Sequence, residues 1–250
     1  MIFLKSAQEI DRLRRANAIV VEVMQRLREH LKPGVTTHDL NRMAEEWIRA
    51  HHAVPSFVGY QGYQHALCTS INEEVVHGIP NPQRSLAAGD IISIDCGVCL
   101  EGFHGDHAWT FYIGDGEPPQ AIQDFLRVSE ESLYRGIAAM HVGSRLFDIS
   151  AAVQQHVEAH GYSVVRDFVG HGIGRALHED PQVPNFGKAG TGMRLTPGLV
   201  LALEPMVNMG GPEVKVLEDG WTVVTLDRSR SAHFEHSVAL TQQGPVILSQ

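Results

Sequence analysis

Hydrophobic residues recur with helical spacing in three parts of the chain. In residues 7–31 apolar side chains follow one another every three to seven positions and line one helix face, with Ser6 before the stretch and Pro33 after it. This stripe predicts an amphipathic helix that Ser6 caps and Pro33 ends. A similar stripe begins near residue 37, and a third helical stretch spans about 119–140.

Elsewhere the pattern changes to short apolar and β-branched runs separated by turn residues, which predicts strands. Asp219-Gly220 between two such runs fits a hairpin turn. The runs are ALCTSI (66–71), IISIDCG (91–97), WTFYIG (109–114), GLVLALEPMV (198–207), EVKVL (213–217), WTVVTL (221–226), AHFEHSVALT (232–241) and PVIL (245–248).

Two segments of the chain resemble each other. GVTTHDLNRMAEEWIRAHH, from Gly34, aligns without gaps to GSRLFDISAAVQQHVEAHG, from Gly143, and each precedes strand-like sequence and a later HGI. This order indicates an internal duplication, the alternative being chance similarity of two amphipathic helices. We expect an α+β fold with one domain over 1–250, built from pseudo-twofold-related halves of roughly 1–115 and 116–250.

Composition narrows the class of protein. Apolar residues make up 43% and charged residues 20% of the 250 positions, as in ordinary globular proteins. The net charge of −9 argues against a nucleic-acid-binding surface. No signal peptide or membrane-length apolar run occurs, which favours a cytoplasmic protein. The cysteines Cys68, Cys96 and Cys99 are too few and too unevenly placed for a disulfide framework or a structural zinc knot.

Four carboxylates interrupt apolar, strand-like sequence. Asp95 lies within IISIDCG, Asp106 at the entrance to HAWTFYIG, Glu204 within VLALEPMV and Glu235 within SAHFEHSVAL. A lone acid in a strand is usually exposed or hydrogen-bonded, but four from both halves suggest a common partner. Divalent cations would relieve their mutual repulsion. With His171 the set is rich in oxygen, and it suits Mn, Fe, Co or catalytic Zn.

Further histidines belong to the HGI elements or follow them. His77 opens the first HGI, His171 opens the second, and His178 comes seven residues later. Beside a metal, a histidine can bind the ion, hydrogen-bond to one of the ligands or donate a hydrogen bond to the substrate. The alternative is an ordinary histidine in a surface loop. The chain has neither a GxSxG nucleophile elbow nor a GxxxxGK[ST] phosphate loop, and GHGIG lacks the context of a dinucleotide motif.

These residues, in this order, resemble the metallopeptidases of the pita-bread fold. The motifs SINEEVVHGIP, GHGIGRALHEDPQVPNFG, ALEPMV and DGWTVVTLDRSRSAHFEHSVALT are similar to those of type I methionine aminopeptidases over nearly the whole chain. The resemblance implies a central antiparallel sheet covered by helices. It also implies a metal-dependent hydrolase that removes the initiator methionine from nascent proteins whose second residue is small.

The resemblance also implies a role for each matching residue. Two divalent ions, Co, Mn, Fe or Zn, would be held by Asp95, Asp106, His171, Glu204 and Glu235, with Asp106 and Glu235 bridging both. A metal-bridging water or hydroxide would attack the scissile amide. Glu204 would transfer protons, His178 would bond the carbonyl, and His77 the amide nitrogen. The methionine pocket would comprise Tyr60, Tyr63, Cys68, Met206 and Trp221.

Three positions depart from the family pattern. Gln61 stands where many members have histidine, Phe57 where many have a smaller residue, and Leu177 where an aromatic is frequent. These changes bear on rate and pocket shape, and leave open a paralogue with reduced or altered specificity. A second alternative is an Xaa-Pro aminopeptidase or prolidase, and a third is a non-catalytic relative. The family role implies nascent N-termini as partners, at the ribosome, and we expect a monomer with no membrane association.

Overall fold

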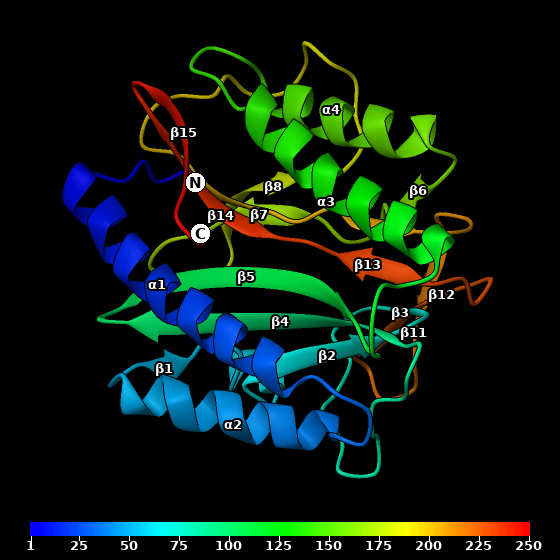
Figure 1. Ribbon diagram of the computed structural model, residues 1–250. Coiled ribbons are helices and arrows are strands. Elements are labelled where there is room, and N and C mark those ends of the chain that lie inside the picture. Colours follow the sequence, from blue (N-terminus) through cyan, green and yellow to red (C-terminus); the bar gives the residue numbers. More distant parts are fainter.

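The computed structural model describes residues 1–250 as two helical pairs flanking a β-rich middle (Figure 1). The first pair is α1 (Ala7–His30) and α2 (Thr37–Ala50), and the second is α3 (Gln120–Ala139) and α4 (Leu146–Ala159). The three helices expected from the hydrophobic stripes are therefore confirmed, two of them to within a residue or so at each end. Ser6 caps α1 through a capping box with Glu9, as its position before the stripe predicts.

The strands form four antiparallel sheets. One has the order β1–β4–β2 with β5 paired to β4, and another has the order β15–β14–β9–β7–β8. Two small sheets, β13–β10–β6 and β11–β12–β3, complete the layer. The strands are β1 (Val54–Pro55), β2 (Leu67–Ile71), β3 (Glu74–Val76), β4 (Ile91–Leu100), β5 (Phe103–Tyr112), β6 (Ser163–Val164), β7 (Gly170–Gly172), β8 (Glu179–Val183), β9 (Val200–Leu203), β10 (Met206–Asn208), β11 (Val214–Val216), β12 (Val223–Thr225), β13 (Ser231–His233), β14 (His236–Thr241) and β15 (Gly244–Ile247).

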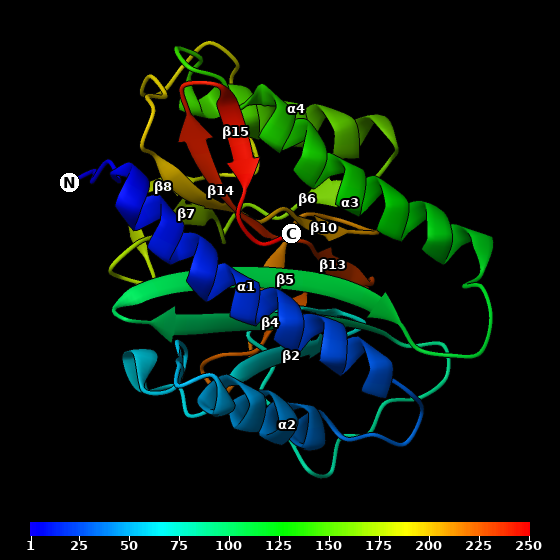
Figure 2. The same ribbon diagram turned by 60° about the vertical axis from the view of Figure 1, so that its left-hand side comes forward.

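Each helical pair covers its own hydrophobic core. Leu27 of α1, Leu40 of α2 and Ile94 of β4 belong to one cluster of buried residues. Phe125 of α3 and Leu201 of β9 belong to a second, larger cluster. Figure 2 shows α1 crossing the β4–β5 hairpin while α3 and α4 lie beyond the other strands. The strands between the two cores therefore pack against helices on both sides, and side chains that project between the two cores are enclosed by the fold.

Two predicted strands are each broken in two, which corrects the sequence interpretation. The segment 198–207 ends as β9 at Leu203 and resumes as β10 in a different sheet, with Glu204 and Pro205 between them. Proline has no backbone N–H to donate to a ladder, which accounts for a break there. The segment 232–241 likewise divides into β13 and β14 on either side of Phe234 and Glu235.

A third correction concerns Asp106. It lies inside β5, which begins at Phe103, and not at the entrance to that strand. The polar His104 and Asp106 masked the start of the strand, because their side chains break the apolar run that the prediction relied on. None of the helices is long and apolar enough to cross a membrane.

Candidate metal centre and substrate pocket

Asp95 and Asp106 project from the same face of the β4–β5 hairpin. Asp95 pairs with Ala108, and Asp106 pairs with Gly97. Directly opposed residues share a face of an antiparallel pair, so the two aspartates are diagonal neighbours on that face. The first half of the chain thus supplies two carboxylates within reach of one ligand.

The remaining three candidate ligands come from the second half. His171 on β7 pairs with Ala202 of β9, and Leu203 at the end of β9 pairs with His236 at the start of β14. Glu204 immediately follows β9, and Glu235 immediately precedes β14. The two glutamates therefore lie at the same end of this strand pair.

The structure brings these side chains together. One donor atom from each of Asp106, His171 and Glu235 lies within 4.8 Å of the others. The Nε2 atom of His171 is 3.4 Å from Oε1 of Glu204 and 3.9 Å from Oδ2 of Asp106. Asp95 is the diagonal neighbour of Asp106 and lines the same pocket as the other four residues, so the fifth candidate belongs to the same cluster.

Hydrogen bonds between the halves fix this arrangement. The N–H of Glu235 donates to the carbonyl of Ala108 at 2.9 Å. The hydroxyl of Ser237 donates to the carbonyl of Asp106 at 2.9 Å and accepts from its N–H at 3.3 Å. Strand β5 of the first half is thereby attached to the start of β14 in the second half, directly beside the candidate ligands.

Two glycines determine how His171 is held. A side chain at Gly170 would collide with the carbonyl of Ala202, and one at Gly172 with the carbonyl of Asp180, so the flanking strands approach closely only because both are glycine. The Nδ1–H of His171 donates to the carbonyl of Gly172 at 2.9 Å. This bond leaves Nε2 without a proton and facing the carboxylates, as a metal ligand requires.

The electrostatics of the cluster fit a cation. Burial raises the pKa of Asp95 to about 7 and that of Glu204 to about 8. Burial, and then the neighbouring carboxylates, raise the pKa of Asp106 and Glu235 well above the usual range. Burial lowers the pKa of His171 to about 3, which keeps its imidazole neutral. Such carboxylates repel one another unless positive charge is placed among them.

Unpartnered atoms provide an independent test of the fit. One buried oxygen each of Asp95, Asp106 and Glu235 has no hydrogen-bond partner. Buried polar atoms are nearly always bonded, so three orphaned carboxylate oxygens in one cluster call for a ligand. Oxygen donors with one imidazole match the preferences of a catalytic divalent metal, and the residues present therefore fit the group that the sequence indicated.

A cavity of about 580 Å³ opens from this cluster. Phe57, Tyr63, Cys68 and Leu177 form a buried apolar group, with Tyr60 and Trp221 packed against it, and all six line the cavity. The rings of Tyr63 and Trp221 meet edge to face with centroids 4.8 Å apart. The wall of the cavity is therefore largely aromatic, and the exposed Gln61 also lines the cavity.

Met206 is the one predicted pocket residue that the structure does not bring to the cavity. It begins β10 and is completely buried among Val75, Val76, Val165 and Val223. The break at Pro205 rotates the chain, so that Glu204 faces the cavity while Met206 packs in the core. Tyr60, Tyr63, Cys68 and Trp221 all lie where the sequence interpretation expected them.

The two predicted substrate-facing histidines also line the cavity. The imidazole of His178 lies 4.1 Å, centroid to centroid, from that of His171, and its Nδ1 is 2.7 Å from the hydroxyl of Tyr60. His77 follows β3 with a positive φ of 61° and has its ring edge against Phe168 and Trp221. Burial lowers the pKa of His77 to about 4, so this side chain is neutral at physiological pH.

Two features of the site escaped the sequence interpretation. The first is His233, which lies 3.4 Å from Glu204. The only sequence signal for it was its spacing of two residues from Glu235, which in a strand places two side chains on one face. The buried ammonium of Lys5 pairs with Glu179, a residue that lines the cavity next to His178. Lys5 belongs to the extended segment before α1, and no local pattern in the sequence links it to residue 179.

Comparison with known proteins identifies the family. Residues 11–242 match the model of metallopeptidase family M24. The chain belongs to this family. It is 54% identical over 249 residues to a methionine aminopeptidase of Clostridium perfringens, a match that covers 100% of this chain and 99% of the relative. The crystal structure of a Thermotoga maritima methionine aminopeptidase matches with a TM-score of 0.97 and 43% identity, each chain being fully covered.

More distant solved structures share the fold at low sequence identity. A Xaa-Pro dipeptidase of Bacillus anthracis matches with a TM-score of 0.78 at 20% identity, and the alignment covers 99% of this chain but 62% of that one. The α+β pita-bread fold expected from the sequence is confirmed by these neighbours. Identity and coverage are both higher for the methionine aminopeptidase than for the Xaa-Pro dipeptidase, so the comparisons favour the former over the prolidase-like alternative.

Proposed function

We propose that this M24 metallopeptidase is a methionine aminopeptidase that removes the initiator methionine from polypeptides whose second residue is small. The observation that supports this most directly is the convergence of Asp95, Asp106, His171, Glu204 and Glu235 at the end of an aromatic-walled cavity. The curated relatives of comparable length carry the same activity in their names.

Asp95, Asp106, His171, Glu204 and Glu235 would together hold two divalent ions of Co, Mn, Fe or Zn. When bound, such ions lower the pKa of a water molecule to about 7 and polarise a carbonyl. Glu204 belongs to the cluster and lines the cavity, where its carboxylate would accept a proton and return it to the leaving amine.

The two histidines would orient the substrate. His178 presents its ring at the cavity surface, and the hydroxyl of Tyr60 at Nδ1 leaves Nε2–H free to donate to the scissile carbonyl oxygen. His77, held neutral by its burial, would contact the scissile amide nitrogen. Neither histidine carries a positive charge that would repel the substrate's free amine.

Selectivity for methionine would come from the apolar wall. Tyr63, Cys68 and Trp221 enclose a narrow space in which a flexible thioether makes favourable contacts with aromatic rings. Phe57 and Leu177 add bulk to the same wall, which supports a close fit around one unbranched side chain. We further propose that the enzyme is a monomer that meets nascent chains at the ribosome in the cytoplasm.

A peptide-cleavage assay tests the proposal. With added Mn(II) or Co(II), the enzyme should release methionine from Met-Ala-Ser, act poorly on Met-Leu-Ser, and leave Ala-Pro-Ser intact, and a chelator should abolish cleavage. The variant Glu204→Gln should lose turnover while it retains its fold by circular dichroism. Cleavage of Ala-Pro-Ser instead would assign the chain to the Xaa-Pro aminopeptidases. Release of an amino-terminal residue other than methionine from peptides of the form Xaa-Ala-Ser would indicate altered specificity.

A further inference from the structure

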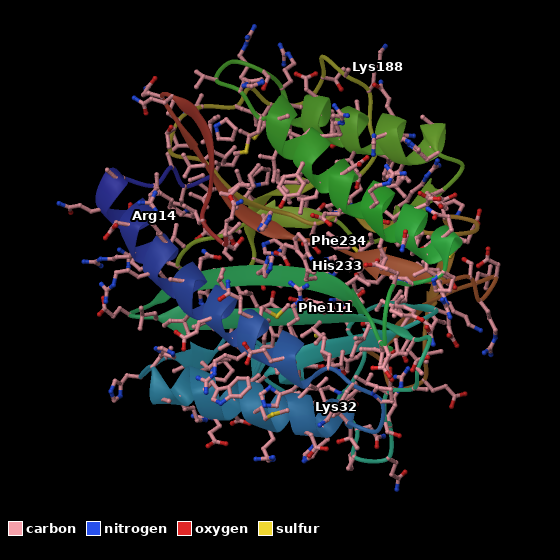
Figure 3. The ribbon with its side chains drawn as sticks, in the orientation of Figure 1. Arg14, Lys32, Phe111, Lys188, His233 and Phe234 are labelled. Atoms are coloured by element: carbon pink, nitrogen blue, oxygen red, sulfur yellow. The ribbon has the colours of Figure 1, made fainter.

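His233 is a buried histidine with no partner for one of its nitrogens. It ends β13 opposite Met206 of β10, and its side chain is only 2% exposed. Its Nε2 atom is buried and has no hydrogen bond. Figure 3 labels it near the middle of the view, between the two helical pairs, whereas Lys188 lies at the edge. Buried polar atoms nearly always have a hydrogen-bond partner, so this unpartnered nitrogen needs an explanation.

The backbone of His233 is clamped from β5. The hydroxyl of Thr110 accepts from the N–H of His233 and donates to its carbonyl, both at 2.9 Å. The hydroxyl of Ser93, opposite Thr110 in the ladder, lies 2.8 Å from that of Thr110 and donates to it. All three residues are buried, so the main chain that carries the imidazole has little freedom.

The clamped imidazole faces Glu204. Nε2 of His233 lies 3.4 Å from Oε2 of Glu204, and Nε2 of His171 lies 3.4 Å from Oε1 of the same carboxylate. Glu204 is therefore held between two imidazoles, one at each oxygen. A contact of 3.4 Å is longer than an ordinary hydrogen bond, and such bonds in active sites commonly tighten when the site is loaded.

The two imidazoles differ in where they carry their proton. His171 donates Nδ1–H to Gly172, which leaves its Nε2 bare for a metal. His233 has no hydrogen bond that fixes a proton on Nδ1, and its Nε2 faces a carboxylate, which favours the proton on Nε2. One imidazole is thus a ligand and the other a donor.

We propose that His233 is a positioning residue, whose Nε2–H donates to Oε2 of Glu204 and so holds Oε1 toward His171 and the metal. The inference rests on the proposed role of Glu204. His233 is not among the residues that line the cavity, so it acts on the substrate only through the carboxylate that it orients. Loss of this donor should therefore weaken metal binding and turnover while the affinity for peptide stays the same.

The test compares His233→Leu with His233→Gln, whose side-chain amide keeps a donor. Titration calorimetry of the chelator-treated proteins with Mn(II) should show affinity about 10- to 100-fold weaker for H233L and largely restored for H233Q. The visible absorption of the Co(II)-loaded proteins should change in H233L. For Met-Ala-Ser, kcat should fall and KM should stay constant.

His156 provides a matched control. Its Nε2 is also buried and unpartnered and lies 3.2 Å from Glu131, but it sits on α4 and its contacts, Glu131 and His160, include no candidate ligand. His156→Gln should therefore leave metal affinity unchanged. If H233L does not fold, Thr110→Val replaces it, because loss of the hydrogen bonds from Thr110 to the backbone of His233 should weaken Mn(II) binding. Thr69→Val, which changes another buried threonine, should leave Mn(II) binding unchanged.

Two results would overturn the proposal. Unchanged Mn(II) affinity and kcat in H233L would show that Glu204 needs no donor at Oε2. Equal loss in H233Q and H233L would show that the imidazole itself matters, as a metal ligand or by its shape. Either result requires a wild-type enzyme that binds Mn(II) and cleaves Met-Ala-Ser, and without that activity it is the proposed function that fails.

Discussion

At the scale of single residues, the hydroxyl of Tyr60 sets the proton position on His178. The oxygen lies 2.7 Å from Nδ1, and the two rings pack with centroids 4.9 Å apart. Tyr60→Phe keeps the ring but removes the donor, so Nε2 would no longer be kept protonated toward the substrate. We expect kcat for Met-Ala-Ser to fall by about tenfold, within the range for such supporting bonds.

Steady-state kinetics of Y60F against Tyr162→Phe checks this prediction. Tyr162 packs on Phe125 and its hydroxyl has no hydrogen bond, so Y162F controls for the loss of an oxygen elsewhere. A Y60F enzyme with wild-type kcat would show that His178 needs no help from Tyr60 in selecting its tautomer.

His77 gives a residue-scale prediction for pH. Burial lowers its pKa to about 4 in the folded protein, against about 6.5 in an unfolded chain. Between these values the unfolded state binds more protons, so the contribution of His77 to stability is complete above pH 6.5 and is lost as the pH falls toward 4. When Tm is measured between pH 6.5 and 4, it should fall less steeply with decreasing pH in His77→Asn than in wild type. Parallel Tm curves for the two proteins would contradict the assignment.

At the scale of elements, local pattern specified the helices but not the breaks in the strands. The stripe over 7–31 predicts α1 closely, because helix formation depends on neighbours three and four residues apart. Glu204 and Glu235 instead lie at breaks in strands that the apolar runs would continue. Pro205 is a local reason for the first break, whereas Glu235 bonds to Ala108 of the distant β5. The burial of Met206 and the approach of His233 to Glu204 depend on the same long-range geometry, which no local period encodes.

The extended segment before α1 is anchored to the loop that carries His178. The ammonium of Lys5 pairs with Glu179 at 2.5 Å, and the two side chains are only 5% and 9% exposed. Glu179 also accepts from the N–H groups of Arg175 and Ala176, so it fixes the turn that leads to His178. Lys5→Met would leave a buried carboxylate without its cation, and we expect a loss of about 3 kcal/mol in unfolding free energy.

Urea unfolding measures this loss, with Arg15→Met as the control. Arg15 pairs with Glu101 at the surface, where the two side chains are 51% and 56% exposed, and such a pair contributes little, so R15M should keep the wild-type midpoint. The double variant K5M with Glu179→Met should recover part of the stability, because both buried charges are then gone. Equal midpoints for K5M and wild type would mean that the loop is held by its backbone bonds alone.

At the scale of the whole molecule, the candidate metal centre joins the two halves. Asp95 and Asp106 come from the first half and the other three ligands from the second, while Ser237 and Glu235 bond to β5 across the junction. A cation bound there must stabilise both halves together. Mn(II) at 100 times its dissociation constant should raise the unfolding free energy by about 2.7 kcal/mol. The whole unfolding transition should therefore move to higher temperature as one step, and a chelator should reverse the shift.

Calorimetric scans with and without Mn(II) test this coupling between the halves. Asp95→Asn removes a candidate ligand contributed by the first half, so it should reduce the shift of the whole transition. Asp11→Asn, an exposed acid on α1, should leave the shift intact. Two resolved transitions, of which Mn(II) moves only one, would show instead that the metal stabilises one half alone and that each half unfolds around its own core.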